Sequence, residues 1–291
     1  MRPTLILLCG IPGSGKTHYA EKYIEEHENT IHLSSDKIRG ELWGNEATQG
    51  DNNEVFSLMQ SRAIEALNNG QNVVYDATNI TRKDRSYIIA LCPKFAKIEC
   101  HIIWAPIETC IERDTTRERT VGKAVIDRML KRFQSPFYDE GIDDIKIIRP
   151  ASWDYDGHEY AENCFENMRI SHDNPHHTLN VYEHCLEAER YLFDIDDDDD
   201  LIFAALRHDI GKPYTKAFVD SKGNPCDTAH YYQHQCVGAW ISYGFGSITP
   251  YSAWLISTHM EPFFNSKYYN KLPSYLKSAV DKLHEADLAA H

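Results

Sequence analysis

The chain has 291 residues, and a length of this order favours two domains. Its 30 basic and 44 acidic side chains give a formal net charge of −14, which argues against a protein held by broad attraction to a phosphate backbone but not against a locally basic groove. No apolar run approaches the ~18 residues of a membrane span, and the eight cysteines include no CxxC pair, so the composition predicts a cytoplasmic globular protein with reduced thiols.

The two halves of the sequence differ in charge and in histidine content. Residues 1–150 carry 20 basic and 22 acidic side chains, whereas residues 151–291 carry 10 and 22. Only 4 of the 15 histidines lie in the first half. This difference predicts two modules of different chemistry, residues 1–152 and residues 175–291, joined by an aromatic and acidic linker at 153–174.

A phosphate-binding loop follows the first predicted strand. The short apolar run 4–9 is typical of a buried parallel strand, and it leads into Gly-Ile-Pro-Gly-Ser-Gly-Lys-Thr at 10–17 and then into a helical segment. The pattern predicts binding of ATP or another NTP with Mg²⁺, because such a loop surrounds phosphate oxygens with backbone N–H groups. Lys16 would reach the β- and γ-phosphates, and Thr17 would hold the metal ion. The expected binding residues are Gly13, Ser14, Gly15, Lys16 and Thr17.

Strands and helices alternate through the rest of the first half. Further strands are expected at 31–34, 72–76, 98–104 and 145–149. Helices are expected at 52–68, 83–91, 107–118 and 123–134. This alternation predicts an α/β domain with a parallel sheet and flanking helices, in which the ligand lies at the carboxyl ends of the strands.

Polar residues follow these strands where a ligand is expected. Asp36 and Arg39 come directly after the second strand, and Asp76 ends the third. Phosphoryl transfer needs a carboxylate that orients the attacking hydroxyl, together with cations that neutralise phosphate. Asp36 fits the first role, and a helix N-cap is its alternative. For Asp76, a catalytic role and a role in supporting Mg²⁺ both remain open.

Three arginines follow the strand that ends at 104. Arg113 and Arg117 are four residues apart, so on a helix they share one face and could reach one polyphosphate together. Arg119 is expected to be a solvated charge on the same lid.

Together these motifs resemble those of the phage-type 5′-hydroxyl polynucleotide kinases. The resemblance rests on GxPGSGKT, SxDxxR, DATN and an Arg-xxx-Arg lid, and it extends over nearly all of residues 1–150. It implies that Asp36 is the general base and that Arg39 binds the phosphate of the acceptor. It also implies that Arg117 contacts the donor phosphates, with Arg113 as a helper.

The second half is expected to be almost entirely helical. The predicted helices are 177–193, 201–210, 229–242, 249–259 and 273–290. Several histidines and aspartates fall on these apolar helices, and a shared metal centre is the simplest explanation for so many ionisable groups there. They are His184, His208, Asp209, His234, His259 and Asp287.

The order H…HD…H…H…D resembles the HD-superfamily phosphohydrolases, and its local context is similar to the HD domain of CCA-adding tRNA enzymes. HDxGKP, at 208–213, is the most specific part. The resemblance implies that one metal ion is bound by the group His184, His208, Asp209 and Asp287. It implies that His234 and His259 complete a second site, with Asp209 bridging the two.

Two further groups are placed by the same resemblance to contact the scissile phosphate, Lys212 and His177. His230 is the weaker alternative to His234 as a ligand. Imidazole and carboxylate ligands without thiolate suit Mn²⁺, Co²⁺, Ni²⁺, Fe²⁺ or Zn²⁺. Asp287 is four residues from the end of the sequence, where a frayed helix would weaken the site.

A kinase and a phosphohydrolase in one chain suit the opposite ends of a broken strand. The leading hypothesis is therefore a bifunctional end-healing enzyme. Its kinase acts on the 5′-OH, and its HD domain removes a 2′,3′-cyclic phosphate or a 2′(3′)-phosphate. RNA ends are the favoured partners, with a separate ligase as a possible second one. The rival hypothesis is a small-molecule or nucleoside kinase fused to a nucleotidase, and a nucleotide sensor without turnover is a third.

Overall fold

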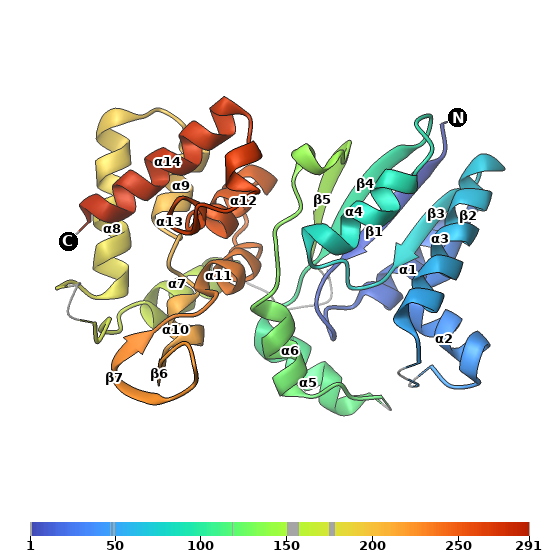
Figure 1. Cartoon of the computed structure of the whole chain (residues 1–291), viewed down its shortest axis with the longest axis horizontal. Helices are drawn as coiled ribbons and strands as arrows, with labels where there is room; N and C mark the ends of the chain where they lie inside the picture. The colour runs from blue at the N-terminus through green and yellow to red at the C-terminus, as the bar shows by residue number, and fades with distance from the viewer. Residues whose placement is uncertain are drawn as a thin grey trace. The chain divides into compact units, whose positions relative to one another are not determined.

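The computed structural model describes residues 2–46, 48, 50–117, 119–149, 157–174 and 178–290 (Figure 1). The chain divides into two compact units. The first unit consists of Met1–Met129 and Pro136–Ser152, and the second consists of Leu130–Ser135 and Trp153–His291. Each unit is described separately below.

The first unit is built on a five-stranded parallel sheet. Its strands are β1 (Thr4–Cys9), β2 (Thr30–Ser34), β3 (Asn72–Asp76), β4 (Lys97–Ile103) and β5 (Asp144–Ile148). Their order in the sheet is β2-β3-β1-β4-β5, so β1 is central and is buried from its second residue onwards. A continuous apolar run such as TLILLC is what a strand covered on both faces requires.

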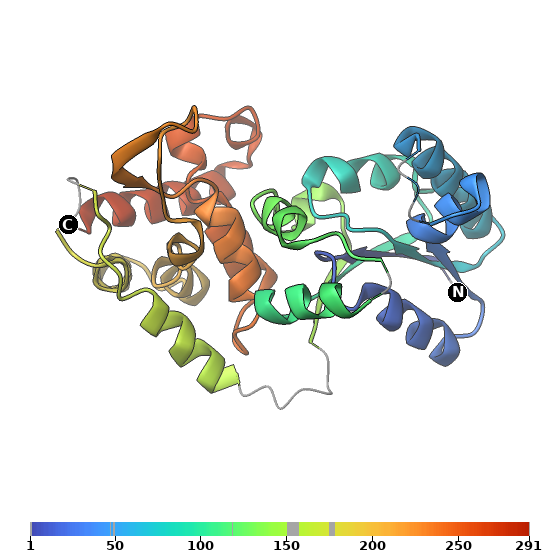
Figure 2. The same cartoon turned by 90° about the horizontal axis from the view of Figure 1, so that it is seen from below.

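Helices connect these strands and cover both faces of the sheet. They are α1 (Lys16–Glu26), α2 (Ser35–Trp43), α3 (Asn52–Asn68), α4 (Arg82–Leu91), α5 (Ile107–Thr116), α6 (Lys123–Leu130) and the 3₁₀ turn η1 (Tyr138–Glu140). Figure 2 shows α1 on one side of the sheet and α3 and α4 on the other. The predicted α/β fold is confirmed, because all five expected strands form one parallel sheet.

A buried ion pair fixes α4 to the turn that precedes β5. The guanidinium of Arg85 is fully buried and donates from Nε and Nη2 to the carboxylate of Glu140, both at 2.7 Å. It also donates from Nη1 to Asn79 O at 2.9 Å. Because its hydrogen bonds are made within the protein, Arg85 has a structural role.

Helix α6 is shorter than its sequence pattern predicts. It ends at Leu130 and not at residue 134, because the six residues Leu130–Ser135 belong to the second unit. There the fully buried ring of Phe133 packs edge-on against Trp240, with ring centroids 5.4 Å apart. Ser135 Oγ and the hydroxyl of Tyr243 are hydrogen-bonded at 2.6 Å.

The second unit is mainly helical, as expected. Its helices are α7 (Gly157–Asn167), α8 (Val181–Ile195), α9 (Asp199–Ala205), α10 (Lys212–Thr215), α11 (His234–Ser242), α12 (Pro250–Thr258), α13 (Glu261–Phe264) and α14 (Ser274–Ala289), with a 3₁₀ turn η2 (Tyr269–Lys271). Helix α8 packs against α9 and α14, and α12 packs against α9 and α11. Helix α7 lies within the segment expected to be a linker, and residues 150–156 are outside the described part of the chain.

A β-hairpin interrupts this helical unit, which the sequence interpretation did not predict. Strands β6 (Ala217–Val219) and β7 (Pro225–His230) are antiparallel, so the helix expected at 229–242 begins only at His234. The carboxylate of Asp220 accepts hydrogen bonds from the backbone N–H groups of Lys222 and Asn224, both at 2.8 Å. An aspartate that closes a turn in this way was the available signal in the sequence.

No helix in the described ranges is both long and apolar enough to cross a membrane. All eight cysteines have free thiols, and six of them are buried.

Candidate functional site

The phosphate-binding loop lies between β1 and α1, at the carboxyl edge of the sheet. Gly13 has a left-handed φ of 80°, and a Cβ there would lie 2.2 Å from the carbonyl oxygen of Cys110. Only glycine therefore lets the loop lie this close to α5. Helix α1 begins at Lys16, so its free N–H groups face the loop and favour an anion.

Two polar side chains of the loop are available to phosphate, one buried and one half-buried. Ser14 is fully buried, and among the described residues its Oγ has no hydrogen-bond partner. Lys16 Nζ donates to Ile11 O at 2.9 Å, and burial lowers the pKa of this amine even though Asp76 opposes the shift. A hydroxyl donor and an ammonium group held in this way fit the phosphate oxygens of a nucleotide.

Thr17 and Asp76 meet beside this loop, together with a histidine that the sequence interpretation missed. Thr17 Oγ1 donates to Asp76 Oδ2 at 2.9 Å, and His32 Nε2 lies 3.0 Å from the same oxygen. The side chains of His32 and Asp76 are both 4% exposed. Of the two roles left open for Asp76, this contact with Thr17 favours the support of Mg²⁺.

Asp36 lies at the centre of a cluster of arginines. Its Oδ1 accepts from Arg39 Nη1 at 2.7 Å and from Arg119 Nη1 at 2.9 Å, while the side chain stays 50% exposed. The helix cap at this point is Ser34, which accepts from Lys37 N, so the alternative of Asp36 as the N-cap is wrong. Arg119 is not simply a solvated charge as expected, because it is paired with Asp36. A local sequence pattern could not reveal this partner, which is 83 residues away in the chain.

Arg113 and Arg117 do not share a helix face as predicted. Helix α5 ends at Thr116, and Arg117 has extended backbone angles. Arg113 Nη1 lies 3.4 Å from Gly13 O, which places this guanidinium at the phosphate-binding loop. Arg117 is paired with Asp114, whose carboxylate also accepts backbone hydrogen bonds from residues 121 and 122.

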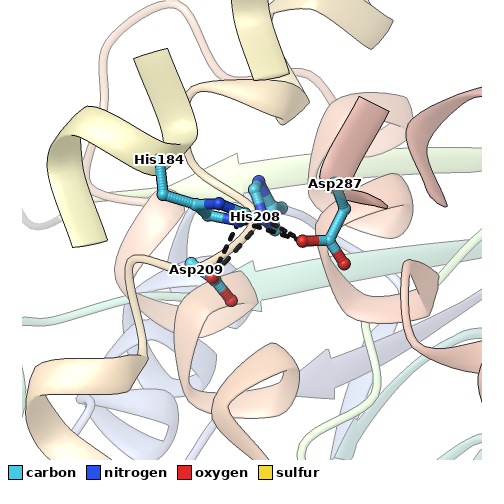
Figure 3. Close-up of side chains that lie close together, drawn as sticks. All are labelled: His184, His208, Asp209 and Asp287. Atoms are coloured by element: carbon cyan, nitrogen blue, oxygen red, sulfur yellow. Dashed lines mark hydrogen bonds and ion pairs between the residues drawn. The ribbon is translucent and has the colours of Figure 1, made fainter. Parts of the chain in front are cut away.

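The second unit brings four predicted ligands into one cluster, which Figure 3 shows. His184 comes from α8, Asp287 comes from α14, and both side chains point towards His208 and Asp209 in the turn after α9. Asp287 Oδ1 lies 2.9 Å from His184 Nε2 and 3.3 Å from His208 Nε2. The two Nε2 atoms are themselves 3.3 Å apart.

A second cluster shares Asp209 with the first. His234 Nε2 lies 3.1 Å from Asp209 Oδ1 and 3.1 Å from His259 Nε2. Its ligand atoms, like those of the first cluster, all lie within 4.8 Å of one another. The two clusters match the two sets of ligands expected from the sequence.

The outer ring nitrogens of all four histidines are bound to backbone carbonyls. Each Nδ1 lies 2.7–2.8 Å from a carbonyl oxygen, which can only accept, so each Nδ1 carries the proton. The partners are Ala290 for His184, Ala205 for His208, Tyr231 for His234 and Ile256 for His259. In the neutral rings the Nε2 lone pairs therefore converge, and two acceptors at this distance cannot bond to each other. A pair of divalent cations fits this arrangement.

The ionisation of these groups differs from ring to ring. Burial opposes protonation of His208, but Cys185 and Asp209 outweigh it and hold the pKa of this ring well above its usual range, so a metal ion has to displace a proton there. Burial, together with the neighbouring His234 and His208, lowers the pKa of His259 to about 3, so this ring is neutral as a ligand must be. Burial opposes ionisation of Asp209, but Lys212 and His208 outweigh it and hold the pKa of this carboxyl well below its usual range. His184 and His208 do the same for Asp287.

Gly211 and Lys212 of the HDxGK motif also have physical roles in this turn. A Cβ on Gly211 would lie 2.1 Å from His234 O, so only glycine lets the turn approach α11 this closely. Lys212 Nζ lies 2.5 Å from Asp209 Oδ2 and 5.3 Å from the centre of the Tyr231 ring. The lysine expected to contact phosphate is thus beside the shared carboxylate.

Two other sequence expectations have different outcomes. His177 lies outside the described residues. His230 belongs to neither cluster among the described residues, because it lies in β7 with its ring stacked on Tyr232. Tyr231 was not predicted; its contribution to the site is a backbone carbonyl, which no side-chain pattern reveals.

Comparisons with known proteins identify both units. Residues 5–136 match the family model of the AAA domain, and residues 176–285 match that of the HD domain. The transcription factor bHLH140 of Arabidopsis thaliana is 25% identical over 145 residues, which cover 47% of this chain and 15% of that protein. The 6-phosphofructo-2-kinase/fructose-2,6-bisphosphatase of Aquarana catesbeiana is 28% identical over 134 residues, which cover 40% of this chain and 27% of that one.

Among solved structures, a chain of the Pnkp1/Rnl/Hen1 RNA repair complex is 22% identical, with a TM-score of 0.42 and coverage of 45% of this chain and 43% of that one. This chain spans less than half the length of each of the three proteins. The chain contains a P-loop domain that matches the AAA domain model, followed by a mainly helical domain that matches the HD domain model.

Proposed function

We propose that the protein heals nucleic-acid ends, RNA ends above all. The P-loop domain phosphorylates a 5′-OH, and the HD domain hydrolyses a 2′,3′-cyclic phosphate or a 2′(3′)-phosphate. The observation that carries this proposal is the combination of two sites in one chain: a phosphate-binding loop beside the Asp36 cluster, and a pair of histidine clusters that share Asp209. The two activities oppose each other on one phosphate, but they complement each other on the two ends of a break.

In the kinase reaction, the 5′-hydroxyl oxygen attacks the γ-phosphorus of the NTP and the bond to the leaving diphosphate breaks. Asp36 accepts the hydroxyl proton. Arg39 binds the phosphate of the acceptor strand, with Arg119 beside it on the same carboxylate. Lys16, Arg113 and Arg117 neutralise the donor phosphates, and Thr17 holds Mg²⁺ with support from Asp76.

In the hydrolysis reaction, the HD residues hold and orient the phosphate end. Two divalent ions at the clusters would polarise a phosphoryl oxygen and lower the pKa of a water nucleophile. Lys212 would contact the same phosphate, since its ammonium group lies beside Asp209. The fixed Nδ1–H bonds keep four imidazoles in one tautomer, so the site is organised before substrate binds.

One oligoribonucleotide tests both activities. It carries a 5′-OH and a 2′,3′-cyclic phosphate and is incubated with ATP and Mg²⁺, and then with Mn²⁺ or Ni²⁺. Mass spectrometry reports both ends, and we expect a gain of one phosphate at the 5′ end and the loss of phosphate at the 3′ end. An unchanged oligonucleotide, in a preparation that still consumes ATP or dephosphorylates a mononucleotide, would overturn the proposal.

Two variants separate the sites. Lys16→Ala should abolish only the kinase, with the exposed Lys22→Ala on the same helix as its control. Asp209→Ala should abolish only the hydrolase, with the exposed Asp194→Ala as its control. If Asp209→Ala removed both activities, the assignment of two independent sites would be wrong.

A small-molecule kinase fused to a nucleotidase is the second candidate. Two observations favour it: the formal net charge of −14, and the similarity of the P-loop half to a 6-phosphofructo-2-kinase/fructose-2,6-bisphosphatase. Salt dependence separates the two candidates, because strand binding weakens steeply with salt whereas the binding of a mononucleotide changes little.

A further inference from the structure

The lid between α5 and α6 carries Arg119, whose side chain reaches across to Asp36. Arg119 Nη1 lies 2.9 Å from Asp36 Oδ1, and Arg39 Nη1 lies 2.7 Å from the same oxygen. Two guanidinium groups thus face one carboxylate, which leaves an excess of positive charge beside the residue proposed to orient the attacking hydroxyl. An anion attached close to that hydroxyl is favoured at this point.

The two arginines are held in different ways. Arg39 also donates from Nη2 to Asn52 Oδ1 at 3.0 Å, and its side chain is only 13% exposed. The side chain of Arg119 is 30% exposed, and Asp36 is its only ionic partner within the described ranges. Arg39 is therefore fixed to the start of α3 as well, whereas Arg119 can exchange Asp36 for another anion. A guanidinium binds phosphate with the same forked geometry as it binds carboxylate.

The same lid is also tied to the side of the site that faces the phosphate-binding loop. The buried carboxylate of Asp114 accepts from the backbone N–H groups of residues 121 and 122 at 3.0 Å and 2.7 Å, and it is paired with Arg117. Burial lowers the pKa of Lys16, and Arg117 is close enough for its charge to add to this shift. Arg117 near the loop and Arg119 at Asp36 are thus two residues apart on one tied segment.

We propose that Arg119 binds the first phosphate of the acceptor strand, and that through Arg119 the acceptor strengthens the binding of the NTP. The inference rests on the proposed kinase function. One ribose separates the 5′-hydroxyl from the next phosphate, so a hydroxyl at Asp36 brings that phosphate beside Arg39 and Arg119. The lid then contacts both substrates, with Arg119 on the acceptor and Arg117 on the donor. Whichever substrate binds first orders the lid for the other, and the coupling has the same size in both directions.

The test measures how the acceptor changes the affinity for an ATP analogue that has an imide between its β- and γ-phosphorus. Isothermal titration calorimetry with Mg²⁺ gives the Kd of the analogue in the presence of either of two acceptors at saturation. One is a dinucleoside monophosphate with a free 5′-OH, and the other is the same molecule with a methylphosphonate linkage, which has a similar shape but no charge. For the wild-type protein, the charged acceptor should give a Kd about 5-fold lower than the uncharged one, at the low end of coupling between two sites.

Variants assign this coupling to one side chain. Arg119→Ala should bind the analogue equally well with both acceptors. Arg119→Lys keeps the charge but not the fork, so it should retain part of the difference. Arg128→Ala removes an exposed arginine from α6 and should show the wild-type difference. Binding of the analogue without acceptor shows that each variant is folded. Equal Kd values with the two acceptors in the wild-type protein, or a wild-type difference in Arg119→Ala, would overturn the inference.

The coupling and the proposed kinase can fail separately, because the binding measurement involves no turnover. If the wild-type protein shows the coupling but transfers no phosphate from ATP to the dinucleoside monophosphate, the proposed kinase is wrong and the role of Arg119 in binding stands. If it transfers phosphate while the two Kd values are equal, the kinase stands and the coupling through Arg119 is wrong.

Discussion

The carboxylate of Asp209 faces both histidine clusters of the HD domain. Its Oδ1 lies 3.1 Å from His234 Nε2, and its Oδ2 lies 3.6 Å from His184 Nε2. One side chain thereby connects ligands from α8 and α11, helices that are far apart in the sequence. The two candidate metal sites therefore share this one carboxylate.

This shared carboxylate predicts different metal contents for different variants. Asp209→Ala should lose both metal ions, whereas His259→Ala should lose only one, because His259 belongs to a single cluster. Inductively coupled plasma mass spectrometry on the purified proteins measures the stoichiometry. For the wild-type protein, metal at 100 times its Kd should raise the free energy of unfolding by about 2.7 kcal/mol, which is seen as a higher Tm. Retention of two ions by Asp209→Ala would contradict the bridging role.

Gly211 provides a test of the close approach between the HD turn and α11. Gly211→Ala would place a Cβ 2.1 Å from His234 O, so we expect a loss of about 1–3 kcal/mol of stability together with reduced metal binding. Gly246→Ala is the matched control, since nothing lies within 4 Å of the added atom. Thermal unfolding of both variants makes the comparison, and equal Tm values would show that the turn is not tightly packed.

His32 should affect the kinase through Asp76. Without the imidazole, the Asp76 carboxylate loses one of two groups that fix it beside Thr17. His32→Ala should raise the Mg²⁺ concentration for half-maximal kinase rate by ~10-fold, the scale of one hydrogen bond to a charged group. His32→Gln, which keeps an N–H donor, should recover part of this loss.

The control for this variant is His27→Ala, because His27 is exposed on the same domain and is stacked on Tyr23 away from Asp76. Hydrolase activity should stay at the wild-type value in His32→Ala, His32→Gln and His27→Ala. If His32→Ala lowered kinase and hydrolase equally, a general loss of folding would explain the result better than a local effect on Mg²⁺.

The ionised carboxylate of Glu99 should stabilise the P-loop domain, and acid should remove this stabilisation. Burial opposes its ionisation, but hydrogen bonds from Lys146, Lys97 and His101 lower its pKa from 4.5 to about 2. Because the folded pKa is depressed, the stabilisation is complete above about pH 4.5 and is lost as the pH falls towards 2.

We therefore expect Glu99→Gln to destabilise the protein by about 1 kcal/mol at pH 7, after allowance for solvent screening, and by less at pH 3. Urea unfolding at the two pH values measures the difference. The exposed Glu21→Gln should show no pH-dependent difference from wild type. A Glu99→Gln effect that is equal at both pH values would exclude an ionic origin.

The sequence alone was enough to predict the kinds of domain and most of the residues that converge. The run TLILLC followed by Gly-rich residues 10–17 marks a strand, a loop and a helix through local chemistry. The histidines and aspartates of the second half are ligand types on apolar helices, so a metal centre could be inferred without coordinates, and the resemblance to the HD phosphohydrolases divided them into two sets. Local periodicity also placed all five strands of the sheet to within a residue or two.

Tertiary structure decided which partner each charged group has. Arg119 pairs with Asp36 and His32 with Asp76 because parallel strands bring distant segments to one edge of the sheet, which no local pattern encodes. The hairpin before His234 and the early end of α6 at Leu130 have the same origin, since packing within the second unit overrides local helix preference. The sequence determines which chemical groups are present and where local elements form, and long-range packing determines the distances between them.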